Sequence, residues 1–204
     1  MGFGLTFSKI TGFPPMWLFF KPRFIGKRPP IKKGEGVIIA SNHHALVDIA
    51  LISMAYPTKW IHFPVSGRIS KRNKFVGFIL KEWGTIPVSN NGADIGVIDN
   101  MVKHVKDGNV VGIFPEGKLH VKGESLPYRP GAVMVALKTG AKIIPIYNDG
   151  NYGLFKRTTV VFGEPFDIRD YCDDALGEHQ DISYLCSVLK GKVEGLREKI
   201  PNKK

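Results

Sequence analysis

Apolar runs alternate along this chain with segments whose apolar residues recur at helical spacing, and this alternation favours an α/β fold. Runs rich in Val and Ile predict buried strands at residues 37–40, 110–114, 142–147 and 158–162. Segments with an apolar face predict helices at residues 47–55, 95–105, 131–138 and 182–200. We expect the apolar face of the last helix to pack on the core. With 204 residues, 43% of them hydrophobic, the chain has the size and composition of one layered domain.

The predicted turn between the first strand and the first helix carries two adjacent histidines, with an aspartate just beyond them. His43 falls in the turn and Asp48 in the first turn of the helix, so an imidazole and a carboxylate can meet there. A histidine that donates one ring nitrogen to a carboxylate is held in one tautomer, and its other nitrogen can take a proton from a hydroxyl near neutral pH. In the alternative interpretation, His43 or His44 caps the helix or fills a polar hole, and the helix dipole favours Asp48 as a first-turn acid.

Four sequence blocks, taken in order, resemble those of the glycerolipid acyltransferase family, and in particular its bacterial 1-acylglycerol-3-phosphate acyltransferases. The blocks are Asn42-His43 with Asp48, Gly84-Thr85-Ile86-Pro87-Val88, Phe114-Pro115-Glu116-Gly117 and Ile143-Ile144-Pro145-Ile146. Together with Phe162-Gly163-Glu164-Pro165, the resemblance covers residues 35–166. It implies one acyltransferase domain over residues 35–204, with a mixed central sheet flanked by helices as in glycerol-3-phosphate acyltransferases.

The resemblance implies acyl transfer from a thioester, acyl-CoA or acyl carrier protein, to a lysophospholipid hydroxyl, with 1-acyl-sn-glycerol-3-phosphate as the first candidate acceptor. In this role His43 is the general base and Asp48 its orienting partner, with no covalent acyl-enzyme, no metal and no other cofactor. The transient oxyanion needs donors such as backbone N–H groups. The matching blocks also suggest substrate-binding residues, namely Asn42, Gly84, Thr85, Glu116 and Gly117.

Two positions where many family members carry a phosphate-binding arginine hold other residues here, Asn90 and Leu119. A planar guanidinium binds phosphate in a bidentate way that a lysine ammonium does not reproduce. Candidate replacements are Lys118, Arg129 and Arg68, the last of which matches by offset a lysine common in the family. An ordinary solvated or turn arginine explains Arg68 and Arg129 equally well. Lysophosphatidate, another lysophospholipid and an amino-acid lipid therefore stay open as acceptors.

Three other chemistries fit the sequence poorly. Residues 112–119 nearly match a nucleotide-binding P-loop, but a leucine replaces the magnesium-binding Ser or Thr, and Glu116 would repel phosphates. A serine hydrolase of the Gly-x-Ser-x-Gly type is excluded because that pattern is absent from the sequence. Metal binding by the two histidines and Asp48 is disfavoured, since adjacent side chains diverge and no second ligand cluster is evident.

Residues 1–34 contain seven Lys or Arg and no acidic residue, and aromatic side chains lie between these cations. Trp and Phe favour the head-group level of a bilayer, and each nearby cation gains about 1 kcal/mol from an anionic leaflet. Pro14 and Pro15 interrupt the apolar stretch, which is too short to span a bilayer and lacks the features of a signal peptide. We therefore expect a peripheral protein whose residues 1–34 bind the anionic cytoplasmic face of the cell membrane.

The net charge of +11 also suits nucleic acid as an anionic partner. No RNA-binding signature accompanies the basic residues, so no nucleic-acid partner is expected. Simple packing of the N-terminal aromatic residues against the domain would explain them without a membrane. A non-catalytic basic binding protein is therefore the alternative to an enzyme. Cys172 and Cys186 form no disulfide framework or metal pattern, and both suit a reducing cytosol as small buried residues.

Overall fold

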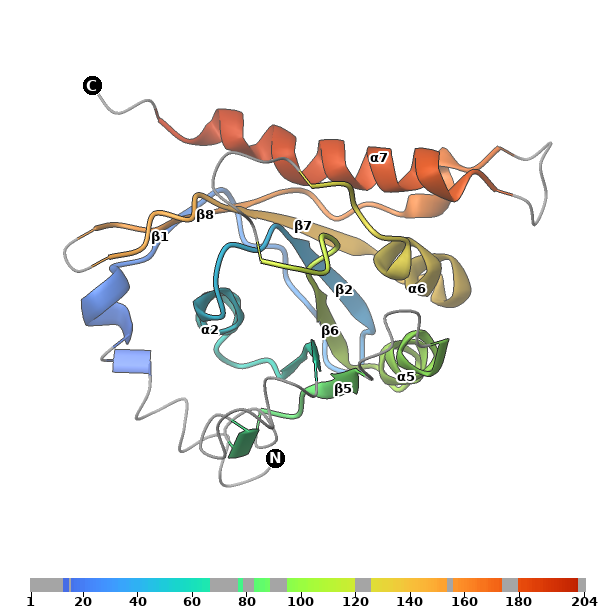
Figure 1. The fold of residues 1–204 in the computed structure, drawn as a ribbon, viewed down its shortest axis with the longest axis horizontal. Helices are drawn as coiled ribbons and strands as arrows, with labels where there is room; N and C mark the ends of the chain where they lie inside the picture. Colours follow the sequence, from blue (N-terminus) through green and yellow to red (C-terminus); the bar gives the residue numbers. More distant parts are fainter. Residues whose placement is uncertain are drawn as a thin grey trace.

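A six-stranded sheet forms the centre of the protein in the computed structural model (Figure 1), with the strand order β1-β8-β7-β2-β6-β3. Its strands are β1 (Arg23–Ile25), β2 (Val37–Ser41), β3 (Ile61–His62), β6 (Val110–Ile113), β7 (Ile143–Asn148) and β8 (Thr159–Phe162). A second, two-stranded sheet pairs β4 (Pro64–Ser66) with β5 (Ile86–Val88). The structure describes residues 13–14, 16–66, 77–78, 83–88, 95–119, 126–153, 156–173 and 180–201.

The central sheet is mixed, as predicted. Strands β2, β3, β6 and β7 run parallel to one another, whereas β8 runs antiparallel to β7 and pairs in parallel with β1. All five residues of β2 are buried, because this central strand has neighbours on both edges and helices on both faces. Its sequence, Val-Ile-Ile-Ala-Ser, is the nearly continuous apolar run that such a position requires.

Helices cover both faces of the sheet and make three layers (Figure 1). On one face, α5 (Ile95–Lys106), α6 (Gly131–Thr139) and α7 (Ile182–Glu194) pack against alternate strand residues such as Ile38 and Val111. On the other face, α2 (Val47–Ala55) packs against Ile39 and its neighbours. Since successive side chains of a strand point to opposite faces, β2 contributes to both cores.

The predicted helices are confirmed, with one correction at the C-terminal end. Helix α6 ends at Gly140, whose φ of 67° is the left-handed conformation expected of a helix-ending glycine. The apolar stripe of α7 is core, as predicted, with Leu185, Leu189 and Val193 all buried. Residues 182–200 were expected to form one helix, but α7 ends at Glu194 and the chain tightens into the 3-10 helix η3 (Gly195–Lys199). Glycine has a low helix propensity, and 3-10 turns are common at helix ends.

The N-terminal segment contributes a strand that its sequence did not predict. Strand β1 lies within residues 1–34 and pairs with β8 at the edge of the central sheet. The strand has only three residues, Arg-Phe-Ile, and two of them are exposed. Such a short segment does not show the apolar run that marks a buried strand. Residues 16–20 are helical, and no helix in the described part of the chain combines the length and apolar character needed to cross a membrane. The division of the chain after residue 34 stays a prediction.

Candidate active site

The predicted catalytic pair lies at the carboxyl ends of the central parallel strands. Strands β2, β6 and β7 are adjacent and parallel, so their carboxyl ends lie side by side. The helix after β2, α2, covers one face of the sheet, and the helix after β6, α6, covers the other. In open α/β sheets, a crevice forms where the chain leaves two neighbouring strands toward opposite faces of the sheet. Ligands of α/β proteins commonly bind at such a point, outside the carboxyl ends of the strands.

His43 and Asp48 are in contact, as their spacing predicted. The His43 Nδ1 atom lies 2.9 Å from Oδ2 of Asp48. Since an ionised carboxylate only accepts hydrogen bonds, the neutral imidazole carries its proton on Nδ1 and its lone pair on Nε2. The Phe114 ring stacks on the imidazole, with centroids 4.0 Å apart and planes 13° apart. Among the described residues Nε2 has no hydrogen-bond partner, so the imidazole is fixed in tautomer and plane with one basic nitrogen unused.

Asp48 is fully buried and accepts hydrogen bonds on both carboxylate oxygens. Besides His43, the backbone N–H groups of His44 and Ala45 donate to Oδ2, over 2.7 and 2.9 Å. On Oδ1, the Asn148 amide donates over 2.8 Å and the Tyr152 hydroxyl donates as well. Burial by itself raises the pKa of Asp48, but the hydrogen bonds led by that from His43 outweigh it and hold this pKa below its ordinary value. The pair therefore contains a carboxylate that stays ionised at neutral pH.

The ring of the second histidine of the turn, His44, binds elsewhere, so the imidazole that pairs with Asp48 is that of His43. The His44 Nε2 atom lies 2.9 Å from the Asn42 side-chain nitrogen and 3.2 Å from the Asn148 carbonyl oxygen. Asn42 itself is buried and exchanges two hydrogen bonds of 2.8 Å with the Asn148 backbone. This exchange joins the end of β2 to the end of β7. The substrate-binding role of Asn42 stays a prediction, while its observed contacts are within the protein.

Asn148 and Tyr152 belong to the site, although the sequence did not indicate them. Both lie about 100 positions after Asp48, and only the parallel pairing of β7 with β2 brings them to it. One signal was available for Asn148, namely a polar amide directly after the apolar run of a strand predicted to be buried. Tyr152 carries no comparable local signal, because it lies beyond the strand in a loop.

The Phe-Pro-Glu-Gly block follows β6, and four predicted site residues lie at or beside it. Gly117 has a φ of 66°, and a Cβ atom there would lie 2.7 Å from Cδ of Arg129. Arg129 therefore lies directly against this turn, where its N–H also donates to the Pro115 carbonyl over 2.7 Å. Lys118 is exposed beside Gly117, whereas Glu116 is buried. The structure thus places a guanidinium from the loop before α6 against the turn after β6.

The Gly84 and Thr85 block stands at the start of β5. The Gly84 carbonyl accepts a 2.7 Å hydrogen bond from Nδ1 of His62, at the end of β3. With a φ of 64°, Gly84 also allows Trp60 to approach closely, since a Cβ would lie 2.7 Å from its Nε1. The observed contacts of Gly84 are thus with β3 and its preceding turn. The predicted site residue Arg68 lies outside the described residues, and so does Asn90, which stands where many family members have an arginine.

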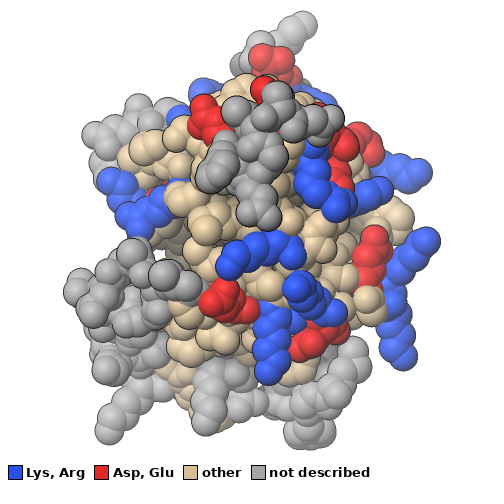
Figure 2. All heavy atoms as spheres, turned by 90° about the vertical axis from the view of Figure 1, so that its right-hand side faces the viewer, with Lys and Arg blue, Asp and Glu red and all other residues tan. Residues whose placement is uncertain are grey.

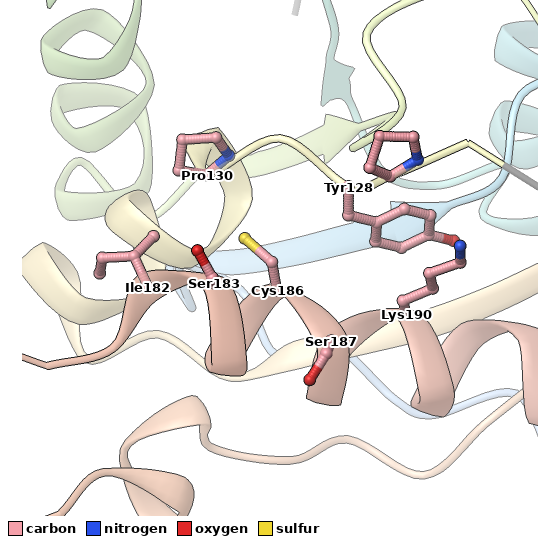
Figure 3. A pocket seen from close by; sticks show the side chains of 8 residues that line it. Tyr128, Pro130, Ile182, Ser183, Cys186, Ser187 and Lys190 are labelled. Carbon is pink, nitrogen blue, oxygen red and sulfur yellow. The ribbon is translucent and has the colours of Figure 1, made fainter.

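A separate hollow of about 360 Å³ lies between α7 and the loop before α6 (Figure 3). It is lined by Pro127, Tyr128, Pro130, Ile182, Ser183, Cys186, Ser187 and Lys190. The predicted site residues are not among them. Cys186 is buried as expected, and burial raises the pKa of its thiol, whereas Cys172 was also expected to be buried but is partly exposed. Within the described ranges, no three His, Cys, Asp or Glu side chains are grouped as a metal site would require.

Comparison with known proteins agrees with this architecture. The crystal structure of the 1-acyl-sn-glycerophosphate (LPA) acyltransferase PlsC from Thermotoga maritima has the same fold and superposes with a TM-score of 0.65. That match covers 95% of this chain and 78% of the other at 21% identity. A family model described as Acyltransferase matches residues 23–148, more than half of the chain, and the protein therefore belongs to the acyltransferase family.

Two curated relatives carry the name 1-acyl-sn-glycerol-3-phosphate acyltransferase. The Bacillus subtilis protein is 27% identical over 171 residues, which cover 81% of this chain and 83% of that protein. The Borreliella burgdorferi protein is 29% identical over 126 residues, which cover 60% of this chain and 50% of that protein. This chain thus spans most of one relative and about half of the other.

Proposed function

We propose that the protein transfers an acyl group from acyl-CoA or acyl carrier protein to the free hydroxyl of a lysophospholipid, with 1-acyl-sn-glycerol-3-phosphate as acceptor and phosphatidic acid as product. The observation that carries the proposal is the His43 imidazole, held by Asp48 at Nδ1 with Nε2 unpaired among the described residues. The family match and the names of the two relatives support the same reaction class. The thioester supplies the acyl group, and the proposal includes no metal or other cofactor.

In the proposed mechanism, one proton passes from the acceptor hydroxyl through His43 to the departing thiolate. Nε2 takes the proton of the acceptor hydroxyl while the hydroxyl oxygen attacks the thioester carbonyl carbon. Asp48 stabilises the imidazolium that forms, and its hydrogen bond keeps the ring oriented. The tetrahedral oxyanion then collapses, the carbon–sulfur bond breaks, and the departing thiolate takes the proton from Nε2. No covalent acyl-enzyme is needed, and the neutral imidazole is regenerated.

Arg129 is the residue that we propose for the phosphate of the acceptor. Its side chain packs against Gly117, in the turn that follows Phe114, and the Phe114 ring stacks on His43. An arginine from another loop would thus replace the one missing at Leu119. A guanidinium can bind a phosphate through two parallel hydrogen bonds, and each hydrogen bond to a charged group contributes about 1.5–3 kcal/mol.

The experiment that tests the function is thiol release from acyl-CoA and from acyl carrier protein, measured with a panel of lysolipid acceptors. We expect release that depends on the acceptor, with lysophosphatidate the best substrate and phosphatidic acid the detected product. Arg129→Ala is expected to raise KM for lysophosphatidate about 10- to 100-fold with little change in kcat, because the ground state and transition state share the phosphate contact.

The matched control for this panel is Arg169→Ala, which removes an exposed arginine that pairs with Asp167 at the 3-10 helix η1 (Ile168–Tyr171). This variant is expected to behave as the unmodified protein. Failure of every acceptor to trigger release from either donor would contradict the enzymatic function. An unchanged KM in Arg129→Ala would contradict only the phosphate site.

The proposed location is the cytoplasmic face of the membrane, bound through the N-terminal segment. Trp17, Leu18 and Phe19 expose 58%, 70% and 49% of their surface, close to the cations Lys21 and Arg23. Exposed apolar side chains beside cations are suited to an anionic bilayer surface. On the face shown in Figure 2, by contrast, the described side chains of both signs are interspersed and form no uniform basic patch.

Replacing Trp17, Leu18 and Phe19 together with serine is expected to weaken binding to anionic vesicles at least about 10-fold, because three apolar side chains no longer enter the interface. Vesicle sedimentation at low and high salt measures this effect, and binding of the unmodified protein should fall as salt rises. Tyr184→Ser, at an exposed aromatic of α7, is the control. Equal binding to neutral and anionic vesicles would count against the proposed location.

A further inference from the structure

We propose that Tyr152, together with Asn148, is a positioning residue for the acyl transfer, which acts by fixing the Asp48 carboxylate and through it the His43 imidazole. This inference rests on the proposed function, since it assigns a role within the same reaction. Neither residue belongs to the sequence blocks that indicated the site. Their contacts with Asp48 are the observation that carries the proposal.

The two oxygens of Asp48 are held from two different parts of the chain. Oδ2 faces the turn after β2, where His43 and two backbone N–H groups donate to it. Oδ1 faces the segment at the end of β7, where Asn148 and Tyr152 donate to it. A carboxylate held on one oxygen alone can still rotate about its Cβ–Cγ bond. Donors on both oxygens fix its plane, and the plane sets the direction of the bond to His43.

The loop after β7 also orients its own donors. The Asn148 side-chain oxygen accepts from the Gly150 N–H over 2.8 Å and lies 3.0 Å from the Tyr152 hydroxyl. This leaves the Asn148 amide nitrogen to donate to Asp48. Gly150 has a φ of 62°, and a Cβ there would lie 2.8 Å from the His44 ring, so a glycine allows the loop to approach the turn after β2.

Toward Asp48, Tyr152 acts as a donor over the working pH range. Burial, the negative charge of Asp48 and the hydrogen bond to it all raise the pKa of Tyr152 far above its ordinary value. The phenol is therefore protonated whenever Asp48 is ionised, and the hydrogen bond between them persists across neutral pH. In return, the bond from Tyr152 helps to hold the pKa of Asp48 low.

The test is Tyr152→Phe, which removes one hydroxyl and keeps the ring. We expect kcat to fall about 10- to 100-fold, because a small misplacement of a catalytic group costs that much. KM for donor and acceptor should stay within about twofold, since Tyr152 acts through Asp48 and not on the substrate. The acid limb of the pH profile should move to higher pH, because a carboxylate that has lost one donor stabilises the imidazolium of His43 more strongly, and the imidazolium is no base.

Asn148→Asp provides a second and independent variant. It places a carboxylate where the amide donated to Asp48 over 2.8 Å, and two carboxylates at that distance do not both stay ionised. The acid limb is expected to move further to higher pH than in Tyr152→Phe. Tyr184→Phe removes an exposed phenol on α7 and should leave both kcat and the pH profile unchanged.

Three outcomes would overturn the proposal. The first is a folded Tyr152→Phe protein whose kcat and acid limb are unchanged. The second is a Tyr152→Phe protein in which only KM changes. The third applies if Tyr152→Phe does not fold, and it is an acid limb that does not move in Asn148→Asp. Circular dichroism and a thermal melt establish folding in each case. Failure of the proposed function is distinguishable, since the unmodified protein would then consume no thioester in the presence of any acceptor.

Discussion

Alanine in place of His43 is expected to lower kcat by about 10³- to 10⁴-fold while the protein stays folded. The reason is that, in the proposed mechanism, Nε2 receives the proton of the acceptor hydroxyl, and no other group in the described part of the site has a comparable nitrogen held by a carboxylate. The side chain is 12% exposed and contributes one stacking contact, with Phe114. Its loss should therefore affect stability far less than activity.

The measurement is acceptor-dependent thiol release under saturating conditions, combined with a thermal melt of the same preparation. His104→Ala is the matched control, because it removes an imidazole at the end of α5 that hydrogen-bonds with the Asn100 carbonyl and has no contact with Asp48. This control should keep full activity. A folded His43→Ala protein that transfers acyl groups at the normal rate would remove the proposed mechanism.

Asparagine in place of Asp48 is expected to impair both catalysis and folding. Without the negative charge, the imidazolium is no longer stabilised and the His43 tautomer is no longer fixed, so kcat should fall about 10²- to 10⁴-fold. In asparagine, an NH2 group replaces one of the two carboxylate oxygens. The groups that donated to that oxygen, either Oδ1 or Oδ2, then lose their acceptor. Buried donors without an acceptor cost about 1–3 kcal/mol each, so the free energy of unfolding should fall by about 2–5 kcal/mol.

The pH dependence of stability provides a second readout of this substitution. The pKa of Asp48 is lower in the folded protein than in the unfolded chain, so its ionisation stabilises the fold above the unfolded value of about 4. This contribution disappears as the pH falls through the lower, folded pKa. The stability gap between the unmodified protein and Asp48→Asn should therefore be widest near neutral pH and narrow in acid.

Urea unfolding at pH 7 and at several acidic pH values checks this prediction. Asp99→Asn, which removes an exposed carboxylate that pairs with Lys138, is the control and should change stability by less than about 1 kcal/mol. Equal stability of Asp48→Asn and the unmodified protein at pH 7 would show that the five hydrogen bonds to this carboxylate do not stabilise the fold.

Elements and contacts that depend on neighbouring residues were predictable from the sequence. Helix α2 and strand β2 follow from apolar spacing, and the contact between His43 and Asp48 follows from a short turn between those two elements. The edge strand β1 was missed because it carries no apolar run and its pairing with β8 is distant in sequence. Local patterns do not encode which strands become neighbours.

The same limit explains why only part of the site was predicted. Asn148 and Tyr152 reach Asp48 because β7 lies beside β2, and a single sequence does not give the strand order. Arg129 was indicated as an anion ligand by its residue type alone, and its packing against Gly117 became evident only from the fold. The contact between His43 and Asp48 was thus predictable locally, whereas the contacts that support it depend on the sheet.

The contact between Phe20 and Tyr152 gives the N-terminal segment a direct connection to the centre of the site. The two rings meet edge to face with centroids 6.3 Å apart, and the Phe20 carbonyl accepts a hydrogen bond of 3.2 Å from the Thr158 N–H. Tyr152 in turn donates to Asp48. One ring contact and one hydrogen bond therefore separate residues 16–20 from the buried carboxylate. A displacement of residues 16–20 would thus act first on the ring whose hydroxyl holds Asp48.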